Sequence, residues 1–317
     1  MRPFYRNIIL FFLLPLIGFG LMELLLRQIP NEYKEKYKVL TKTNNSYNTL
    51  ILGNSFTYFG INPAWMKTPV YNASQINESI FLHHYKFQLA RPHFKNLHTI
   101  VVPISFANLR FSKYPDKKLN LLKNYLLYMG LNAPVSIFNY AEVSAESFKE
   151  NIQRIITFYI KHENNWGSNE GGWGNFYQSE QKLDLVKTTR VRYNTTLRRI
   201  KDGEREVAYP SNIQLLNQWM EACREQNIQV IFLYMPVSSV MYQNYNPAQL
   251  HATDSIMLRL VQTFPNVQYI NFLQSNQFND QDFYDADHLH DIGAKKMSYI
   301  LDSILINATK HRDKKKS

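Results

Sequence analysis

The sequence contains a single cysteine, Cys223, among its 317 residues. A lone cysteine excludes an internal disulfide and any metal site built from several thiolates. Cys223 lies at helical spacing from three apolar side chains, Leu216, Trp219 and Met220. That pattern is typical of a buried core thiol and not of a catalytic nucleophile. Because one unpaired cysteine is compatible with oxidising and reducing compartments alike, it does not indicate where the protein resides.

Acidic residues are scarce, with 25 Asp and Glu against 36 Lys and Arg and a formal net charge of +11. Such an excess raises the question of a nucleic-acid partner, but no helix-turn-helix, zinc-finger or RNA-recognition signature is present. Five basic residues and one acid lie in the tail, residues 310–317, which is typical of a solvated terminus. We therefore expect no nucleic-acid partner. The 45% of hydrophobic residues excludes a disordered chain.

The chain has one long apolar run, residues 8–26, in which Glu23 is the only charged side chain. A helix that crosses a bilayer needs ~20 apolar residues. Arg2 and Arg6 precede the run, which favours a cytoplasmic N-terminus, although lysines also follow it. The alternative is a cleaved signal peptide, but no small-x-small cleavage site follows the run. We expect residues 1–30 to form an uncleaved, single-pass transmembrane signal anchor.

Short apolar runs alternate with helical patterns after a polar, lysine-rich stalk at residues 31–48. This alternation predicts a parallel sheet covered by helices on both faces, in an α/β domain at residues 49–309. The predicted strands are 49–52, 70–71, 99–104, 230–234 and 267–270, and the predicted helices are 80–89, 215–223, 256–264 and 294–306.

Residues 110–210 interrupt this rhythm and are predicted to be a large, partly helical insertion, with a Gly-, Trp- and Asn-rich segment at 164–177. Exposed rings on such a loop stack on sugars or cover a site, which would make Trp166 and Trp173 a substrate lid. The other interpretation is that both rings pack the loop onto the domain. The sequence leaves the two interpretations open.

A serine follows the first predicted strand directly, in Gly53-Asn54-Ser55. Parallel sheets place their sites outside the carboxyl ends of the strands. A serine hydroxyl is unreactive unless a base is held beside it by a third group. Near the other end of the chain, His288 is a candidate base, and Asp285 is placed to fix its tautomer and stabilise its charged form.

Gly53-Asn54-Ser55 near the start and Asp285-x-x-His288-Leu-x-x-x-Gly293 near the end together resemble the SGNH (GDSL-like) hydrolase superfamily. The resemblance implies a flavodoxin-like three-layer sandwich and a catalytic triad without a cofactor. Ser55 would be the nucleophile, Asp285 the orienting acid and His288 the base.

The chain departs from that family at several positions. Asn54 stands where an aspartate is usual, the second block Asn72-Ala73-Ser74-Gln75 lacks a glycine, and the third block ends at Asn108. The oxyanion hole is accordingly expected from the Ser55 amide, an amide of Ala73 or Ser74, and the Asn108 side chain. Because losing one such donor costs ~10²- to 10³-fold in rate, an eroded hole indicates a slow or acyl-selective enzyme.

A metal site is the alternative use of the C-terminal cluster of Asp285, Asp287, His288 and His290. Residues spaced one apart on a loop point in divergent directions, so we expect neither a metal nor a cofactor.

The resemblance, the predicted anchor and the aromatic insertion favour an enzyme that removes or transfers a small acyl group, such as acetyl, on an extracytoplasmic glycan. Anchored proteins of this superfamily act in the modification of bacterial cell-surface polysaccharide or teichoic acid. The resemblance thus implies the bacterial cytoplasmic membrane as the location, with the domain outside. The alternative is a non-catalytic envelope protein of the same fold, a binding partner in an acylation or polysaccharide-export complex.

Overall fold

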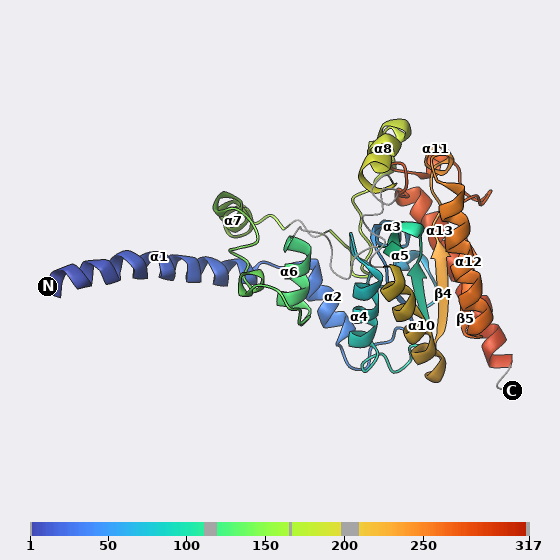
Figure 1. Ribbon diagram of the computed structural model, residues 1–317, viewed down its shortest axis with the longest axis horizontal. Coiled ribbons are helices and arrows are strands. Elements are labelled where there is room, and N and C mark those ends of the chain that lie inside the picture. Colours follow the sequence, from blue (N-terminus) through green and yellow to red (C-terminus); the bar gives the residue numbers. More distant parts are fainter. Residues whose placement is uncertain (1, 111–118, 165–166, 198–208, 315–317) are drawn as a thin grey trace. The chain divides into compact units, whose positions relative to one another are not determined.

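The computed structural model describes residues 2–110, 119–164, 167–197 and 209–314 (Figure 1). The chain divides into two compact units. Unit 1 comprises residues 1–38 and 116–166, and unit 2 comprises residues 39–115 and 167–317. The predicted insertion at 110–210 therefore contributes to both units.

A five-stranded parallel sheet forms the centre of unit 2, in the order β2-β1-β3-β4-β5. Its register pairs Leu50 with Ile100, and Ile100 in turn with Val230. This order, with β1 between β2 and β3, is the flavodoxin-like doubly wound arrangement. The predicted α/β class and all five predicted strands are confirmed. The strands are β1 Thr49–Ile51, β2 Val70–Asn72, β3 Thr99–Pro103, β4 Gln229–Tyr234 and β5 Val267–Asn271.

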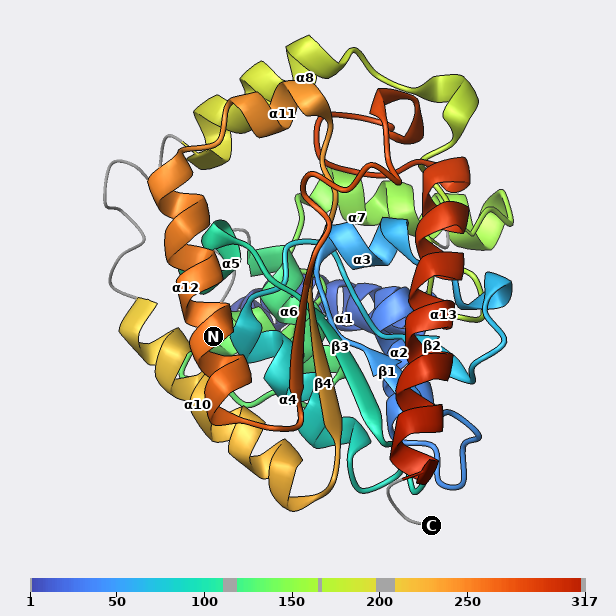
Figure 2. The same cartoon turned by 90° about the vertical axis from the view of Figure 1, so that its right-hand side faces the viewer.

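Helices cover both faces of the sheet, with α13 on one side and α4, α10 and α12 on the other (Figure 2). On the α13 face, Ile51, Val101 and Leu233 of the strands pack with Met297 and Leu301 of the helix. On the other face, the Trp219 ring of α10 packs on Phe87 of α4, with the ring centroids 5.7 Å apart. The helices of unit 2 are α3 Ser55–Gly60, α4 Ile80–Ala90, α5 Phe106–Arg110, α8 Leu185–Arg192, α10 Tyr209–Glu225, α11 Ser239–Gln243, α12 Pro247–Thr263 and α13 Asp291–Lys314.

Unit 1 is helical and is organised around a buried carboxylate. Glu142 forms ion pairs with Lys123 at 2.8 Å and Arg154 at 3.0 Å, and it accepts a hydrogen bond from Tyr128. Its helices are α1 Arg2–Gln28, α2 Glu32–Leu40 (whose last two residues fall in unit 2), α6 Leu119–Tyr128 and α7 Phe148–Ile155, which continues into a π-helical turn, Ile156–Ile160. The segment predicted as a stalk thus contains α2.

Helix α1 is long and apolar enough to span a membrane over Leu10–Gln28. A signal sequence passes the same test of length and composition.

Residues 167–177 form a strap that packs against the edge of the sheet and against α3. The Asn72 amide donates to the Gly171 carbonyl at 3.0 Å, and the Gly174 amide donates to the Tyr58 carbonyl at 3.0 Å. Between them, Gly172 has a φ of +87°, a backbone conformation that glycine adopts without a steric penalty. The strap requires glycine there, since a Cβ at position 172 would lie 2.0 Å from the Asn72 carbonyl oxygen.

Gly172→Ala is expected to destabilise unit 2, with Gly171→Ala as its matched control. Strain in a backbone region that L-residues rarely adopt costs on the order of 1–3 kcal/mol. A Cβ at position 171 meets its nearest atom, in Pro63, at 3.3 Å. Circular dichroism melts of the full chain in detergent should give a clearly lower melting temperature for Gly172→Ala alone. Equal melting temperatures for the two variants would contradict this role of the strap.

Candidate active site

Ser55 is the first residue of α3, two residues beyond Gly53 at the carboxyl end of β1. The turn is tight, because a Cβ on Gly53 would lie 2.1 Å from Thr57 Oγ1 and 2.6 Å from the Pro103 ring. Asn54 caps the helix, as its Oδ1 accepts a hydrogen bond of 3.1 Å from the Phe56 amide. Asparagine and aspartate cap helices about equally well, which accounts for Asn54 where the resembled family has aspartate.

The loop before α13 closes on itself and so sets the direction of two side chains. The Tyr284 amide donates to the His288 carbonyl at 2.8 Å. Asp285 Oδ1 accepts hydrogen bonds from the amides of Asp287 at 3.1 Å and His288 at 2.9 Å. The carboxylate is thereby turned toward the imidazole, and both of its oxygens lie 3.0 Å from His288 Nδ1.

His288 links this loop to Ser55. Its Nε2 lies 2.8 Å from Ser55 Oγ. An ionised carboxylate only accepts hydrogen bonds, so Nδ1 carries the proton and Nε2 accepts the one that Ser55 donates. The structure thus brings Ser55, His288 and Asp285 into one hydrogen-bonded chain with the connectivity of a Ser-His-Asp triad.

Aromatic rings enclose the imidazole, whose side chain is 2% exposed. Phe56 stacks on it at a centroid distance of 5.4 Å and an interplanar angle of 28°. Phe59 and Tyr177 approach it at steep angles, at 5.7 and 5.4 Å. These rings exclude water and strengthen the electrostatic interactions of the triad.

Asp285 stays ionised despite its burial. Burial raises its pKa, but the charge and hydrogen bonds of His288, the Asp287 amide and the charge of Arg192 together lower the pKa to about 2. A carboxylate that is charged at neutral pH is the form that stabilises an imidazolium.

Two neighbours of His288 were not predicted from the sequence. Arg192, the last residue of α8, was not identified, and Asp287 was considered only as a metal ligand. Arg192 Nε lies 2.9 Å from Asp287 Oδ1, and its Nη2 lies 3.2 Å from His288 Nδ1. Burial raises the pKa of Asp287. Burial alone would lower the pKa of Arg192, but the charges of Asp287 and Asp285 outweigh it and raise that pKa. Arg192 lies in the insertion, where no motif or periodicity marks it.

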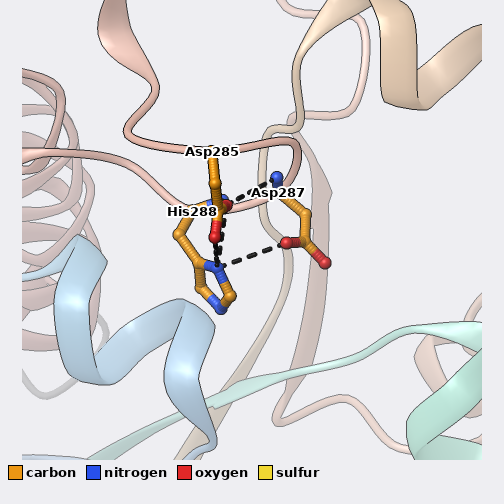
Figure 3. A group of neighbouring side chains, drawn as sticks. All are labelled: Asp285, Asp287 and His288. Carbon is orange, nitrogen blue, oxygen red and sulfur yellow. Dashed lines mark hydrogen bonds and ion pairs between the residues drawn. The ribbon is translucent and has the colours of Figure 1, made fainter. Parts of the chain in front are cut away.

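The donor atoms of Asp285, Asp287 and His288 lie within 4.8 Å of one another, close enough to hold a metal ion (Figure 3). Both carboxylates converge on the same imidazole nitrogen in Figure 3. The Arg192 guanidinium already supplies a positive charge to this cluster. The cluster does not fit a metal site, because His288 Nδ1 is already hydrogen-bonded to Asp285 and the guanidinium already neutralises part of the negative charge. The fourth residue considered, His290, hydrogen-bonds the Gln281 carbonyl through Nε2.

A cavity of about 150 Å³ lies beside Ser55. A cavity of that volume in another protein holds benzene, so only a small group fits. Its lining is mixed: Asn54, Ser55, Phe56, Asn77, Ser105, Phe106, Ala107, Asn108, Arg192, Tyr234, Met241, Tyr245 and Asp287.

Asn108 lines this cavity and, in the described part of the chain, has a free side-chain donor for an oxyanion. Its Oδ1 accepts a hydrogen bond of 2.6 Å from Ser105, whereas its buried Nδ2 has no hydrogen-bond partner among the described residues. The Ser55 amide, at the first position of α3, has no intrahelical acceptor. Ser55 and Asn108 therefore stay the predicted oxyanion donors.

The expectation for Ala73 and Ser74 is not met. The Ala73 amide donates to the Ile51 carbonyl at 2.8 Å, which extends the β1–β2 pairing by one bond. The Ser74 amide donates to Asn72 Oδ1 at 3.0 Å. Both amides are engaged and are not available to an oxyanion in this arrangement.

Trp173 is not a substrate lid. Its side chain is buried, its Nε1 donates to the Phe59 carbonyl at 2.6 Å, and its ring lies 5.2 Å from that of Trp65. It packs the strap onto α3, the other interpretation of this segment. Trp166 lies outside the described residues.

No protein-family model and no curated protein matches the chain. Among solved structures, the chain is similar to one from Streptococcus pneumonia that is provisionally described as a platelet activating factor. The sequence identity is 11% and the TM-score 0.42, over 86% of this chain and 91% of that chain. A likeness at this level says nothing about function.

Asp285→Asn is expected to change the pH dependence of stability. A carboxyl group with a depressed pKa contributes stability above its unfolded pKa of about 3.9, and that contribution is lost as the pH falls toward the folded value of about 2. The shift corresponds to on the order of 2 kcal/mol at neutral pH. Melting temperatures should therefore separate wild type from the variant at neutral pH and converge as the pH falls from about 4 to about 2.

Asp287→Asn is the matched control, with the opposite sign. Since the pKa of Asp287 is raised, its ionisation opposes folding, and wild type loses stability relative to this variant as the pH rises through that pKa. If the melting temperatures of wild type and Asp285→Asn differ by the same amount from about pH 4 to about pH 2, the electrostatic account of the site is contradicted.

Proposed function

We propose that the protein is a serine esterase or O-acyltransferase of the SGNH type. The observation that carries the proposal is the hydrogen-bonded chain from Ser55 Oγ through His288 to Asp285, with distances of 2.8 and 3.0 Å. Its parts occur in the order and sequence context that the family resemblance implies. The flavodoxin-like strand order agrees with it.

In the proposed reaction, His288 Nε2 takes the proton from Ser55 as Oγ attacks the acyl carbonyl. The Ser55 amide and Asn108 Nδ2 donate to the oxyanion. The ester C–O bond then breaks and His288 returns the proton to the leaving alkoxide, which leaves an acyl-Ser55 intermediate. Water or a sugar hydroxyl attacks this intermediate and gives its proton to His288. The bond between the acyl carbon and Ser55 Oγ then breaks, His288 returns the proton to Ser55, and the acyl group leaves as an acid or a new ester.

The proposed substrate is a small, acetyl-like acyl ester on an extracytoplasmic glycan. The cavity of about 150 Å³ beside Ser55 is consistent with a small acyl group. Helix α1 is proposed as a single-pass anchor in a bacterial cytoplasmic membrane, with Arg2 and Arg6 on the cytoplasmic side. The glycan is proposed from the family resemblance and from the extracytoplasmic location.

Ser55→Ala is expected to abolish labelling by a fluorophosphonate probe and to lower p-nitrophenyl acetate turnover by on the order of 10³-fold or more. The full chain in detergent is the material for both assays. Ser239→Ala is the matched control, since it removes an exposed hydroxyl at the same edge of the sheet, where Ser239 contacts Asp280. If Ser55→Ala labels and turns over like wild type, the proposed function is wrong.

Asn108→Ala is expected to lower kcat by about 10²- to 10³-fold with little change in KM, because an oxyanion donor acts mainly in the transition state. Ser105→Ala should cause a smaller loss, since that hydroxyl holds Asn108 in place: it donates to Asn108 Oδ1 and accepts from the Asn108 backbone amide. Steady-state kinetics on p-nitrophenyl acetate measure both effects. A wild-type kcat in Asn108→Ala would remove this side chain from the proposed oxyanion hole.

The engagement of the Ala73 and Ser74 amides favours a second candidate, a non-catalytic envelope protein that keeps the fold for binding. This candidate acts as a partner in polysaccharide modification or export. It predicts that the wild-type chain resists the fluorophosphonate probe and turns over no ester. The two assays therefore separate the candidates.

A further inference from the structure

Outside α1, the most exposed large apolar side chains of the described residues lie in unit 1. Ile137 is 80% exposed, Phe138 72%, Ile160 70% and Phe148 61%, and no large apolar side chain described in unit 2 exceeds 59%. These four residues are called the apolar collar. Single exposed apolar residues are common on soluble proteins, but several in one short segment mark an interaction surface.

The segment that carries the collar lies along the C-terminal part of α1. The Phe148 ring packs edge-on against Phe19 at a centroid distance of 6.4 Å. The Val143 amide donates to Glu23 at 2.9 Å. Further along α1, Tyr159 donates to the Leu25 carbonyl at 3.1 Å, and Arg27 donates to the Tyr140 carbonyl at 2.8 Å. Figure 1 shows α7 beside this part of α1.

The charged residues of α1 set the depth of these contacts. Glu23 and Arg27 form an ion pair at 2.5 Å. Charged side chains are costly inside a bilayer and favour its surface, so this pair marks the level of the interface. Phe19 lies four residues before Glu23, which is ~6 Å toward the apolar part of the helix. The Phe148 ring therefore reaches below the level of the charged pair.

We propose that the apolar collar inserts into the boundary between headgroups and acyl chains of the bilayer that α1 spans. Unit 1 then rests on the membrane surface instead of standing clear of it. Amphipathic segments insert by ~5–10 Å, which agrees with the depth of Phe148. Lys149 and Lys161, both exposed and each next to a collar residue, extend their ammonium groups to the headgroups.

Helix α1 adds further exposed apolar side chains to this contact. The collar touches α1 through Phe148, and the side chains of that helix from Leu10 to Leu25 are largely exposed and apolar. A bilayer covers the collar and α1 at once. A second protein chain would have to reach the collar at the membrane boundary to cover it. The proposal does not depend on the chemistry of Ser55.

The test places an environment-sensitive NBD label on the full chain reconstituted in phosphatidylcholine vesicles. Separate variants carry Phe138→Cys, Phe148→Cys or Ile160→Cys. The native Cys223 is fully buried and serves as the unlabelled blank in wild type. Because all three positions are exposed, we expect these substitutions to leave the fold intact.

Gln153→Cys is the matched control. Gln153 is exposed and lies on the same helix as Phe148, about 140° around its axis. The collar labels should emit at shorter wavelength, be quenched by lipids with a doxyl group on the acyl chain, and resist aqueous iodide severalfold better than the Gln153 label.

Two outcomes would overturn the proposal. Iodide quenching of the collar labels equal to that of the control would place the collar in water. Protection from iodide without quenching by doxyl lipid would place it against protein, either a second copy or another membrane protein.

Discussion

The two hydrogen bonds that Asp285 accepts from the amides of its own loop are the constraint on which the candidate site depends. They hold the carboxylate against the turn, and the carboxylate in turn orients His288 toward Ser55. The loop itself is supported from the turn between β4 and α11, because the Ser238 amide and hydroxyl both donate to the Ala286 carbonyl, at 3.0 and 2.8 Å. Residues 272–290, which follow the edge strand β5, are thus held near the end of β1, where Ser55 lies.

The charged groups around the imidazole, negative and positive, are gathered in a place with little water. Two carboxylates and one guanidinium face the ring, and three aromatic rings pack around it. In the proposed reaction, the imidazolium that forms when Ser55 loses its proton would be stabilised by Asp285 and Asp287 and opposed by Arg192. The contacts of Arg192 would therefore act on the proposed proton transfer.

The strands and the Ser55, Asp285 and His288 cluster could be predicted because both depend on local patterns. Apolar runs of strand length define the sheet, and a parallel sheet brings the ends of its strands to one edge. The use of the Ala73 amide could not be predicted, since it depends on how far the β1–β2 pairing extends beyond Asn72. Arg192 and the packing of Trp173 follow from the path of the insertion, which no periodic pattern fixes. Ile137 and Phe138 are ordinary apolar residues in the sequence, and only their exposure in the structure sets them apart.

The most direct measurement of the central geometry is the proton between His288 and Asp285. In nuclear magnetic resonance spectra of the histidine-¹⁵N-labelled chain in detergent, a strong hydrogen bond to a buried carboxylate predicts a far-downfield proton on His288 Nδ1 that disappears in Asp285→Asn. A spectrum without this resonance in the folded wild-type chain, or one unchanged by Asp285→Asn, would contradict the arrangement of serine, imidazole and carboxylate described above.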